Sequence, residues 1–387
     1  MKHFNISICI GLLISLIGCK EEAKGTLETF FNSKEIKTNY KLKHAKGFTV
    51  KPYENYKKLI ISDPWPESNK TYTYALIDRE DAASITLNRN EFDAIVLTPV
   101  EKIVVTSTTH IPALEALGVE KSLVGFPGTD YISSKKTRVL INAENIRELG
   151  KNEGINTEVL LDLQPEVVIA FGVDGNNKSM NTVQTLGIPV IYNGDWVEKT
   201  PLAKAEWIKF FGLLFNEEKK ADSIFNQIEA DYQEAQILAT NAKNRPTVLF
   251  GAMHKDVWYL PQGTSPEAQF LEDANVNYLW SDTKGKGSLA LSFESVFEKA
   301  KNADLWLSPS YYTSLEALKK ANTHYTKFDA YKNEHVFSFT NTTGETGGVL
   351  YYELGIARPD LVLKDMIKIC HPELMVDYET TFFEKLR

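Results

Sequence analysis

The stretch TPLAKAEWIKFFGLLFNEEKKADSIFNQIEADYQEAQILATN, residues 200–241, decides how the chain is organised. It opens with Thr200 and Pro201, a hydroxyl residue at the N-cap and a proline at the first helical position, which is a common helix start. Apolar residues then recur at helical spacing, with a possible break at Phe215-Asn216. Beyond the break there is no proline or glycine, and at about 1.5 Å per residue this part would be roughly 35 Å long. We therefore expect a connecting helix over residues 200–243, in which residues 217–241 span two lobes.

Both flanks of this helix alternate short apolar segments with helical ones, the pattern of an α/β domain. Before them, residues 46–99 contain three strand-like segments separated by turns, which predicts a small β extension on the edge of the first lobe. The predicted fold is therefore α/β, with two Rossmann-like lobes (residues 100–199 and 244–387), one long joining α-helix and an N-terminal β extension. In such lobes ligands sit outside the carboxyl ends of the strands, so we expect one cleft between the lobes.

The N-terminus has the features of an export signal. A short basic start precedes an apolar run over residues 4–17, which is too short to span a membrane comfortably. Leu16-Ile17-Gly18-Cys19 resembles a bacterial lipobox, which implies a signal peptide over residues 1–18 and a lipid on Cys19. An ordinary signal peptide that ends near a cysteine is the alternative. We expect a tether over residues 19–45 and a periplasmic protein of the cell envelope, held to a membrane through its lipid alone.

The composition and net charge limit the kinds of partner and the disulfides that the chain can have. The chain has 387 residues and a net charge of −8, with no basic cluster, so nucleic acid is not an expected partner. Cys9 leaves with the signal peptide and Cys19 carries the lipid, so Cys370 remains without an intramolecular disulfide partner. We expect a monomer.

An approximate internal repeat links the two lobes. Residues 156–169 and 292–307 each begin with a capping residue, carry a glutamate in the first helical turn and end in a short apolar strand. Glu158 and Glu294 occupy the same place in the two units. The helix dipole favours a carboxylate there, so either glutamate alone would be explained by charge placement.

The segments KIVVT (102–106), ALEALG (113–118), LQPEVV (163–168) and LGIPVI (186–191) resemble periplasmic binding proteins of the iron–siderophore and cobalamin class. With Ala357-Arg358-Pro359 and His371-Pro372, the resemblance covers about residues 100 to 373. It implies the substrate-binding component of an ABC importer. It also implies that Glu158 and Glu294 dock into arginines of a permease dimer, a pairing that is bidentate and specific.

The expected ligand is an iron chelate (siderophore), with cobalamin or haem as alternatives. His110 and His254 follow the first strands of the two lobes, where they could face each other across the cleft or be ordinary loop residues. No third histidine joins them, so we expect no direct metal ligation and no cofactor. The cobalamin branch carries tryptophans before each docking glutamate, and this chain has none there. Because aromatic faces grip large flat ligands, the ligand-binding candidates are His110, Tyr131, Phe171, Trp196, His254, Trp258, Tyr351 and Arg358.

Two other functional classes compete with this interpretation. Two-lobed α/β folds also house metal chelatases, but the chain has no GxGxxG after a strand, no P-loop and no nucleophile elbow. We therefore expect no enzyme. The other alternative is a surface protein that binds ligand without a permease.

Overall fold

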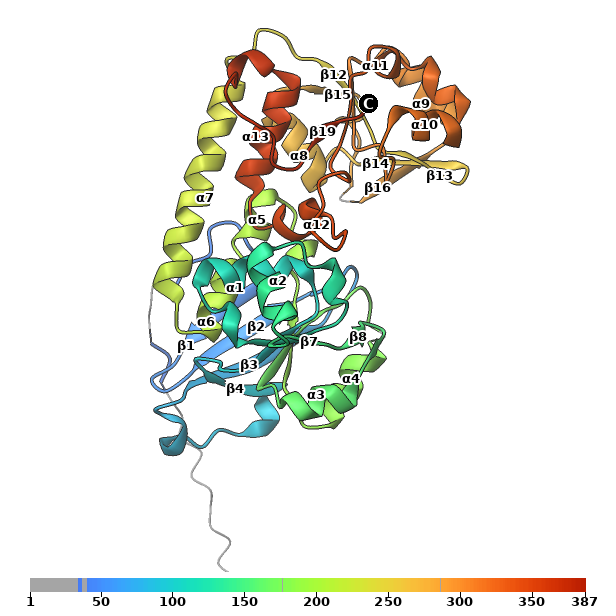
Figure 1. The fold of residues 1–387 in the computed structure, drawn as a ribbon. Coiled ribbons are helices and arrows are strands. Elements are labelled where there is room, and N and C mark those ends of the chain that lie inside the picture. Colours follow the sequence, from blue (N-terminus) through green and yellow to red (C-terminus); the bar gives the residue numbers. More distant parts are fainter. Residues whose placement is uncertain (1–33, 37–39, 176, 286) are drawn as a thin grey trace, which may run out of the picture.

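The computed structural model describes residues 34–36, 40–175, 177–285 and 287–387 (Figure 1). The lipobox, Cys19 and the start of the tether lie outside the described residues. The described part of the chain contains no helix that is both long and apolar enough to cross a membrane.

The first lobe is built on a parallel five-stranded sheet in the order β11-β10-β5-β6-β7. Its strands are short and, apart from the exposed edge strand β7, mostly buried, as parallel strands covered on both faces are. They are β5 (Ile103–Val105), β6 (Leu123–Phe126), β7 (Arg147–Glu148), β10 (Val167–Phe171) and β11 (Val190–Asn193). The helices of this lobe are α1 (Ile111–Leu117), α2 (Lys135–Asn142), α3 (Thr157–Leu163) and α4 (Lys178–Thr185).

The N-terminal β extension forms a four-stranded sheet, β1 (Phe48–Pro52), β2 (Lys57–Ser62), β3 (Thr71–Asp78) and β4 (Ala94–Thr98). It does more than lie on the edge of the first lobe, because its apolar face shares one hydrophobic core with β5, α1 and α6. Tyr74 on β3 also accepts a hydrogen bond at its hydroxyl from the backbone N–H of Tyr192, on the edge strand β11 (3.3 Å). The extension and the first lobe are therefore packed as one body.

The second lobe has a sheet in the order β15-β12-β17-β18-β19, parallel except at β19. Its strands are β12 (Thr247–Phe250), β15 (Asn277–Tyr278), β17 (Leu305–Leu307), β18 (Val336–Ser338) and β19 (Glu384–Lys385). A smaller antiparallel sheet, β13 (Ala252–His254), β14 (Val257–Pro261) and β16 (Ser288–Leu291), projects from it. The helices are α8 (Pro266–Asp273), α9 (Phe293–Ala300), α10 (Leu315–Ala321), α11 (Asp329–Lys332), α12 (Leu350–Leu354) and α13 (Pro359–Cys370).

Three helices connect the lobes: α5 (Pro201–Ala205), α6 (Ile208–Leu214) and α7 (Glu218–Ala239). The predicted start is confirmed, since the Thr200 hydroxyl accepts the N–H of Ala203. The predicted break is also confirmed, because Asn216 adopts a left-handed conformation (φ 55°) that ends α6. Every residue of α6 is buried in the first lobe, whereas the 22 residues of α7 run along one side of the molecule to the second lobe (Figure 1). The break therefore separates a packing helix from a spanning helix.

Candidate functional site

Strand order locates the crevice of each lobe. In the first sheet the order reverses at β5, with β6 and β7 on one side and β10 and β11 on the other. In the second sheet it reverses at β12, between β15 and β17. Ligands of open α/β sheets bind at such reversals, outside the carboxyl ends of the strands. The residues expected there are Thr106 and Phe171 in the first lobe and Gly251 and Ser308 in the second.

A cavity of about 230 Å³ lies at the carboxyl ends of β5, β6 and β10. Hydrogen bonds fix its floor, because the Phe171 N–H donates to the Thr106 hydroxyl (2.8 Å) and the Asn152 amide donates to the Thr106 carbonyl (3.0 Å). Tyr131, which is 71% exposed, stands at its rim. Tyr352 on α12 of the second lobe also lines it, so the cavity is an interlobe space.

A second, larger interlobe cavity of about 1030 Å³ lies beside the first. The loop between β2 and β3 and Trp196 form one wall, while Phe250, Gly251 and Tyr259 form the other. Trp196 donates its indole N–H to the Gly172 carbonyl (3.2 Å), and its ring centroid is 5.6 Å from that of Phe171. This contact places the two cavities next to each other. We use the name interlobe cleft for both cavities together.

The structure brings Tyr131, Phe171 and Trp196 to the interlobe cleft, as the sequence predicted. Their role as ligand contacts stays a prediction. Tyr259 (44% exposed) and Tyr352 (45%) line the cleft from the second lobe, and Tyr311 (69%) lies beside Tyr352 without lining either cavity. The hydroxyl oxygens of Tyr311 and Tyr352 are 3.3 Å apart, and burial raises the pKa of Tyr352.

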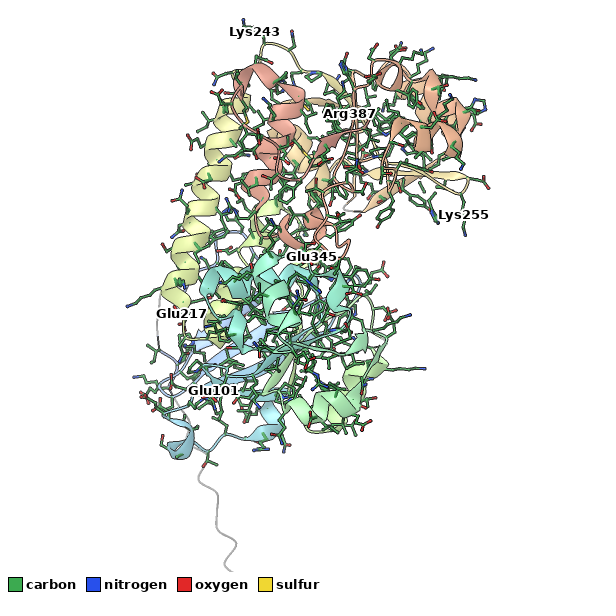
Figure 2. The ribbon with its side chains drawn as sticks, viewed as in Figure 1. Glu101, Glu217, Lys243, Lys255, Glu345 and Arg387 are labelled. Atoms are coloured by element: carbon green, nitrogen blue, oxygen red, sulfur yellow. The ribbon has the colours of Figure 1, made fainter. Side chains whose placement is uncertain are left out.

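The predicted histidine pair is wrong as a pair facing the cleft. His110 is fully buried, its ring centroid is 5.5 Å from that of Phe211, and neither ring nitrogen has a hydrogen-bond partner among the described residues. Burial lowers the pKa of His110 to about 3, so the ring is neutral. His254 is exposed at the end of β13, beside the hairpin turn at Lys255 (Figure 2), and it lines neither cavity of the interlobe cleft.

Three further candidates line neither cavity of the interlobe cleft. Trp258 is 0% exposed and lies at the centre of the second core, 5.6 Å from Trp306 between ring centroids. Tyr351 stacks on Phe339 (4.2 Å) within the same core, so its neighbour Tyr352 faces the cleft instead. Arg358 is held by both carboxylate oxygens of Asp360 (2.9 and 2.7 Å), which matches its alternative interpretation as a structural residue at a helix start.

Sequence reasoning missed Trp65 as part of the site. It lies in a proline-flanked loop of the β extension, is 4% exposed and packs against Gly172, just after β10. A Cβ atom on Gly172 would lie 2.7 Å from the indole, so only glycine allows this close approach. The signal for it was an aromatic side chain inside a turn-rich segment, where such a residue needs a packing partner.

The two glutamates of the repeat occupy equivalent positions. Glu158 lies in the first turn of α3 and Glu294 in the first turn of α9, and both are exposed. The N-caps are equivalent too, since Asn156 accepts the N–H of Val159 and Ser292 accepts the N–H of Ser295. The structure thus presents one carboxylate on each lobe.

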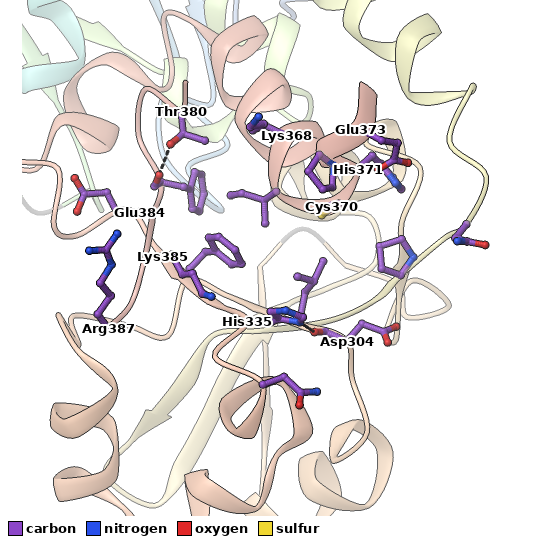
Figure 3. Close-up of a pocket in the computed structure, with 18 of the residues that line it drawn as sticks. Asp304, His335, Lys368, Cys370, His371, Glu373, Thr380, Glu384, Lys385 and Arg387 are labelled. Atoms are coloured by element: carbon purple, nitrogen blue, oxygen red, sulfur yellow. Dashed lines mark hydrogen bonds between the residues drawn. The ribbon is translucent and has the colours of Figure 1, made fainter. Parts of the chain in front are cut away.

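A large polar groove of about 1340 Å³ lies elsewhere, at the amino ends of β12, β17 and β18 (Figure 3). His335 contacts the Asp304 carbonyl (3.3 Å), and the buried His371 contacts the Ala274 carbonyl (2.9 Å). Because it opens at the wrong ends of the strands for an α/β ligand site, we do not assign the ligand to it. The described residues contain no group of three or more His, Cys, Asp or Glu side chains that could hold a metal ion.

Comparison with known proteins agrees with this geometry. An uncharacterised lipoprotein of Methanocaldococcus jannaschii, MJ0878, is 26% identical, and the match covers 98% of this chain and 94% of that one. A periplasmic heme-binding protein from Pseudomonas aeruginosa has the same fold (TM-score 0.57, 15% identity, 74% of this chain and 98% of that one). So does a possible iron-binding periplasmic protein from Staphylococcus epidermidis (TM-score 0.55, 17% identity, 71% and 100%).

The family model of periplasmic binding proteins matches residues 103–343, well over half of the chain. The match begins at β5 and includes both sheets' reversal points, the three connecting helices and both exposed glutamates. The chain therefore belongs to the periplasmic binding protein family.

Proposed function

We propose that this protein captures an iron chelate of siderophore type in the interlobe cleft and delivers it to an ABC permease. The observation that carries the proposal is the gathering of aromatic side chains on both walls of the cleft, Tyr131, Phe171 and Trp196 facing Tyr259 and Tyr352. Aromatic faces bury flat organic surfaces and hold them by stacking. The iron and heme ligands in the titles of the two solved relatives support an iron-bearing ligand.

Haem is the second candidate, and the tyrosine pair favours it. The hydroxyls of Tyr311 and Tyr352 lie 3.3 Å apart on side chains that are 69% and 45% exposed. A phenol oxygen is an established ligand of haem iron. Haemin bound by either oxygen would show a shifted absorption spectrum, and that shift would be lost in the variant in which both tyrosines are phenylalanine.

Delivery would use the two exposed glutamates. We infer that Glu158 and Glu294 pair with arginines of the permease, because carboxylate–guanidinium pairs are bidentate and one carboxylate stands on each lobe. Membership of a solute-binding family gives no support to the chelatase-like alternative.

Membrane attachment would use Cys19. The lipobox-like LIGC segment supports a lipid on Cys19, and so does the printed description of MJ0878 as a lipoprotein. Metabolic labelling with radioactive palmitate tests this directly. The wild-type chain should be labelled and Cys19→Ser should not, whereas equal labelling of both would contradict the anchor.

The ligand itself is tested by native mass spectrometry and absorption titration with a ferric catecholate, a ferric hydroxamate, haemin and cyanocobalamin. We expect one ferric chelate or haemin to bind at one molecule per chain, and Phe171→Ala to weaken it. Phe92→Ala is the matched control, a partly buried ring that packs on Tyr56 in the β extension, away from the cleft. The proposal fails if none of the four binds, or if Phe92→Ala and Phe171→Ala weaken binding equally.

A further inference from the structure

The lobes meet a second time, away from the connecting helices. Residues 342–353 of the second lobe pack against the loop 128–134 of the first. Figure 2 shows Glu345, in the middle of this segment, at the junction of the lobes. Helix α12 also contacts α1 and the short turn Thr108–His110 that precedes it.

Four hydrogen bonds cross this junction. The Thr346 hydroxyl donates to the Asp130 carbonyl (2.7 Å), and the Ser133 hydroxyl donates to the Gly348 carbonyl (2.9 Å). The backbone N–H groups of Ser133 and Ser134 donate to the two carboxylate oxygens of Glu353 (2.6 and 2.9 Å). Glu353 is 2% exposed, so one buried side chain of the second lobe holds two backbone donors of the first.

The backbones themselves touch at two glycines. A Cβ atom on Gly348 would lie 2.2 Å from the Tyr131 carbonyl oxygen, and one on Gly344 would lie 2.5 Å from the Cα of Ser133. Neither distance leaves room for a side chain. The two lobes are therefore in van der Waals contact at this junction, and any larger residue at Gly344 or Gly348 would push them apart.

This junction lies directly beside the smaller cavity of the interlobe cleft. Tyr131 and Tyr352 both line the smaller cavity of the interlobe cleft; Tyr352 is adjacent to Glu353 in the chain, and Tyr131 lies two residues before Ser133. We propose that Glu353 is a positioning residue: by binding the N–H groups of Ser133 and Ser134 it fixes the separation of Tyr131 from Tyr352 and so the width of the cleft. That the width of the cleft controls ligand release rests on the proposed function. The effect of Glu353 on the separation of the lobes does not.

The charges around Glu353 make this contact sensitive to pH. Burial, together with the negative charge of Glu115 on α1, raises the pKa of Glu353 to about 7, although the two backbone N–H groups oppose the rise. His110 is neutral because burial lowers its pKa. The nearby cations are engaged elsewhere, Lys136 with Glu120 (2.9 Å) and Arg358 with Asp360 (2.7 Å).

The sign of the pH effect follows from these values. A carboxyl freed by lobe opening would titrate near its ordinary value of about 4.5, so the closed junction holds its proton more tightly. The advantage of the closed form is therefore complete below about pH 4.5 and is lost as the pH rises to about 7. We expect the lobes to separate more readily at pH 8 than at pH 5.

Double electron–electron resonance between spin labels tests this without any ligand. Labels are placed at Asp162→Cys and Glu298→Cys, on exposed faces of α3 and α9, with Cys9 and Cys19 replaced by serine and Cys370 buried. We expect Glu353→Ala to lengthen and broaden the interlobe distances, and Glu353→Gln to remove their pH dependence. Glu345→Gln, an exposed change in the same segment, should give the same interlobe distances as the wild-type chain.

Two variants keep the proposal testable if Glu353→Ala does not fold. Gly348→Ala should widen the lobes at every pH because it acts by contact, and Thr346→Val should widen them slightly by removing one crossing hydrogen bond. Distances in folded Glu353→Ala equal to those of the wild-type chain would overturn the proposal. A pH dependence that persists unchanged in Glu353→Gln would overturn the assignment of the titration to Glu353. Because no ligand is present, neither result depends on whether the chain binds iron chelates.

Discussion

Replacing Tyr131 with alanine should weaken ligand binding, and the size of the loss can be worked out from the exposed area of the tyrosine ring. Its side chain is 71% exposed at the rim of the interlobe cleft, so a ligand that stacks on it covers surface that is otherwise in water. A tyrosine buries on the order of 200 Å² when fully covered. Roughly 50 to 100 Å² of apolar area is therefore available to a flat ligand on one or both faces.

At about 25 cal/mol per Å², that area contributes about 1 to 2.5 kcal/mol to binding. Since about 1.4 kcal/mol corresponds to a tenfold change, Tyr131→Ala should raise Kd by roughly 5- to 60-fold. Tyr131→Phe keeps the ring and should stay within about twofold of the wild-type chain, unless the hydroxyl binds the ligand.

Isothermal titration calorimetry with the tightest ligand of the four-compound panel measures these changes. The matched control is Ile237→Ala, an apolar side chain that is 68% exposed on α7, outside the cleft. An unchanged Kd in Tyr131→Ala would refute the stacking argument. Equal losses in Tyr131→Ala and Ile237→Ala would show that the effect is not local to the cleft.

Three further changes test other parts of the account. Replacing both Glu158 and Glu294 with alanine should leave ligand affinity unchanged and abolish uptake by cells, and normal uptake would contradict the docking role. Glu206 is 0% exposed, accepts hydrogen bonds from three backbone N–H groups and forms an ion pair with the buried Lys209. Glu206→Ala should therefore lower the free energy of unfolding, measured in urea, by about 3 to 5 kcal/mol. The control Glu234→Ala, an exposed change on the same connecting segment, should alter it by less than about 0.5 kcal/mol. Burial raises the pKa of Asp195 from 3.8 to about 6. The protonated carboxyl therefore stabilises the folded state by about 3 kcal/mol below about pH 4, and this stabilisation is lost as the pH rises to about 6. Urea titrations should show this loss in the wild-type chain and not in Asp195→Asn, and parallel pH profiles would contradict it.

Helix signals and the alternation of strands with helices were readable from the sequence. The proline after Thr200 and the polar interruption at Asn216 predicted where the connecting helices begin and break, because caps and left-handed residues are local features. The alternation of apolar strands with helices predicted two parallel sheets. The crevice position then follows from topology and not from side-chain detail.

Side-chain direction was not readable, and this explains the wrong candidates. Successive residues of a strand point to opposite faces, so Trp258 enters the core while Tyr259 faces the cleft, yet both are aromatic and the sequence cannot say which face is buried. On α12, Tyr351 and Tyr352 are separated by about 100° around the helix axis and have the same ambiguity.

His110 failed for a related reason. Its place after β5 correctly put its backbone near the crevice, but the short turn Thr108–His110 and the helix start at Ile111-Pro112 rotate the ring into the core. The contacts of Trp65 and Glu353 could not be found because each depends on segments more than 100 residues away in the chain. Local pattern carries no information about such pairs.

Hydrogen exchange of the protein with and without a saturating ferric chelate tests the central claim most directly. The account predicts slower exchange at both walls of the interlobe cleft, in residues 106–108, 129–133 and 171–172 of the first lobe and 349–352 of the second. Protection confined to residues 368–373 and 383–387, around the far groove of the second lobe, would contradict it.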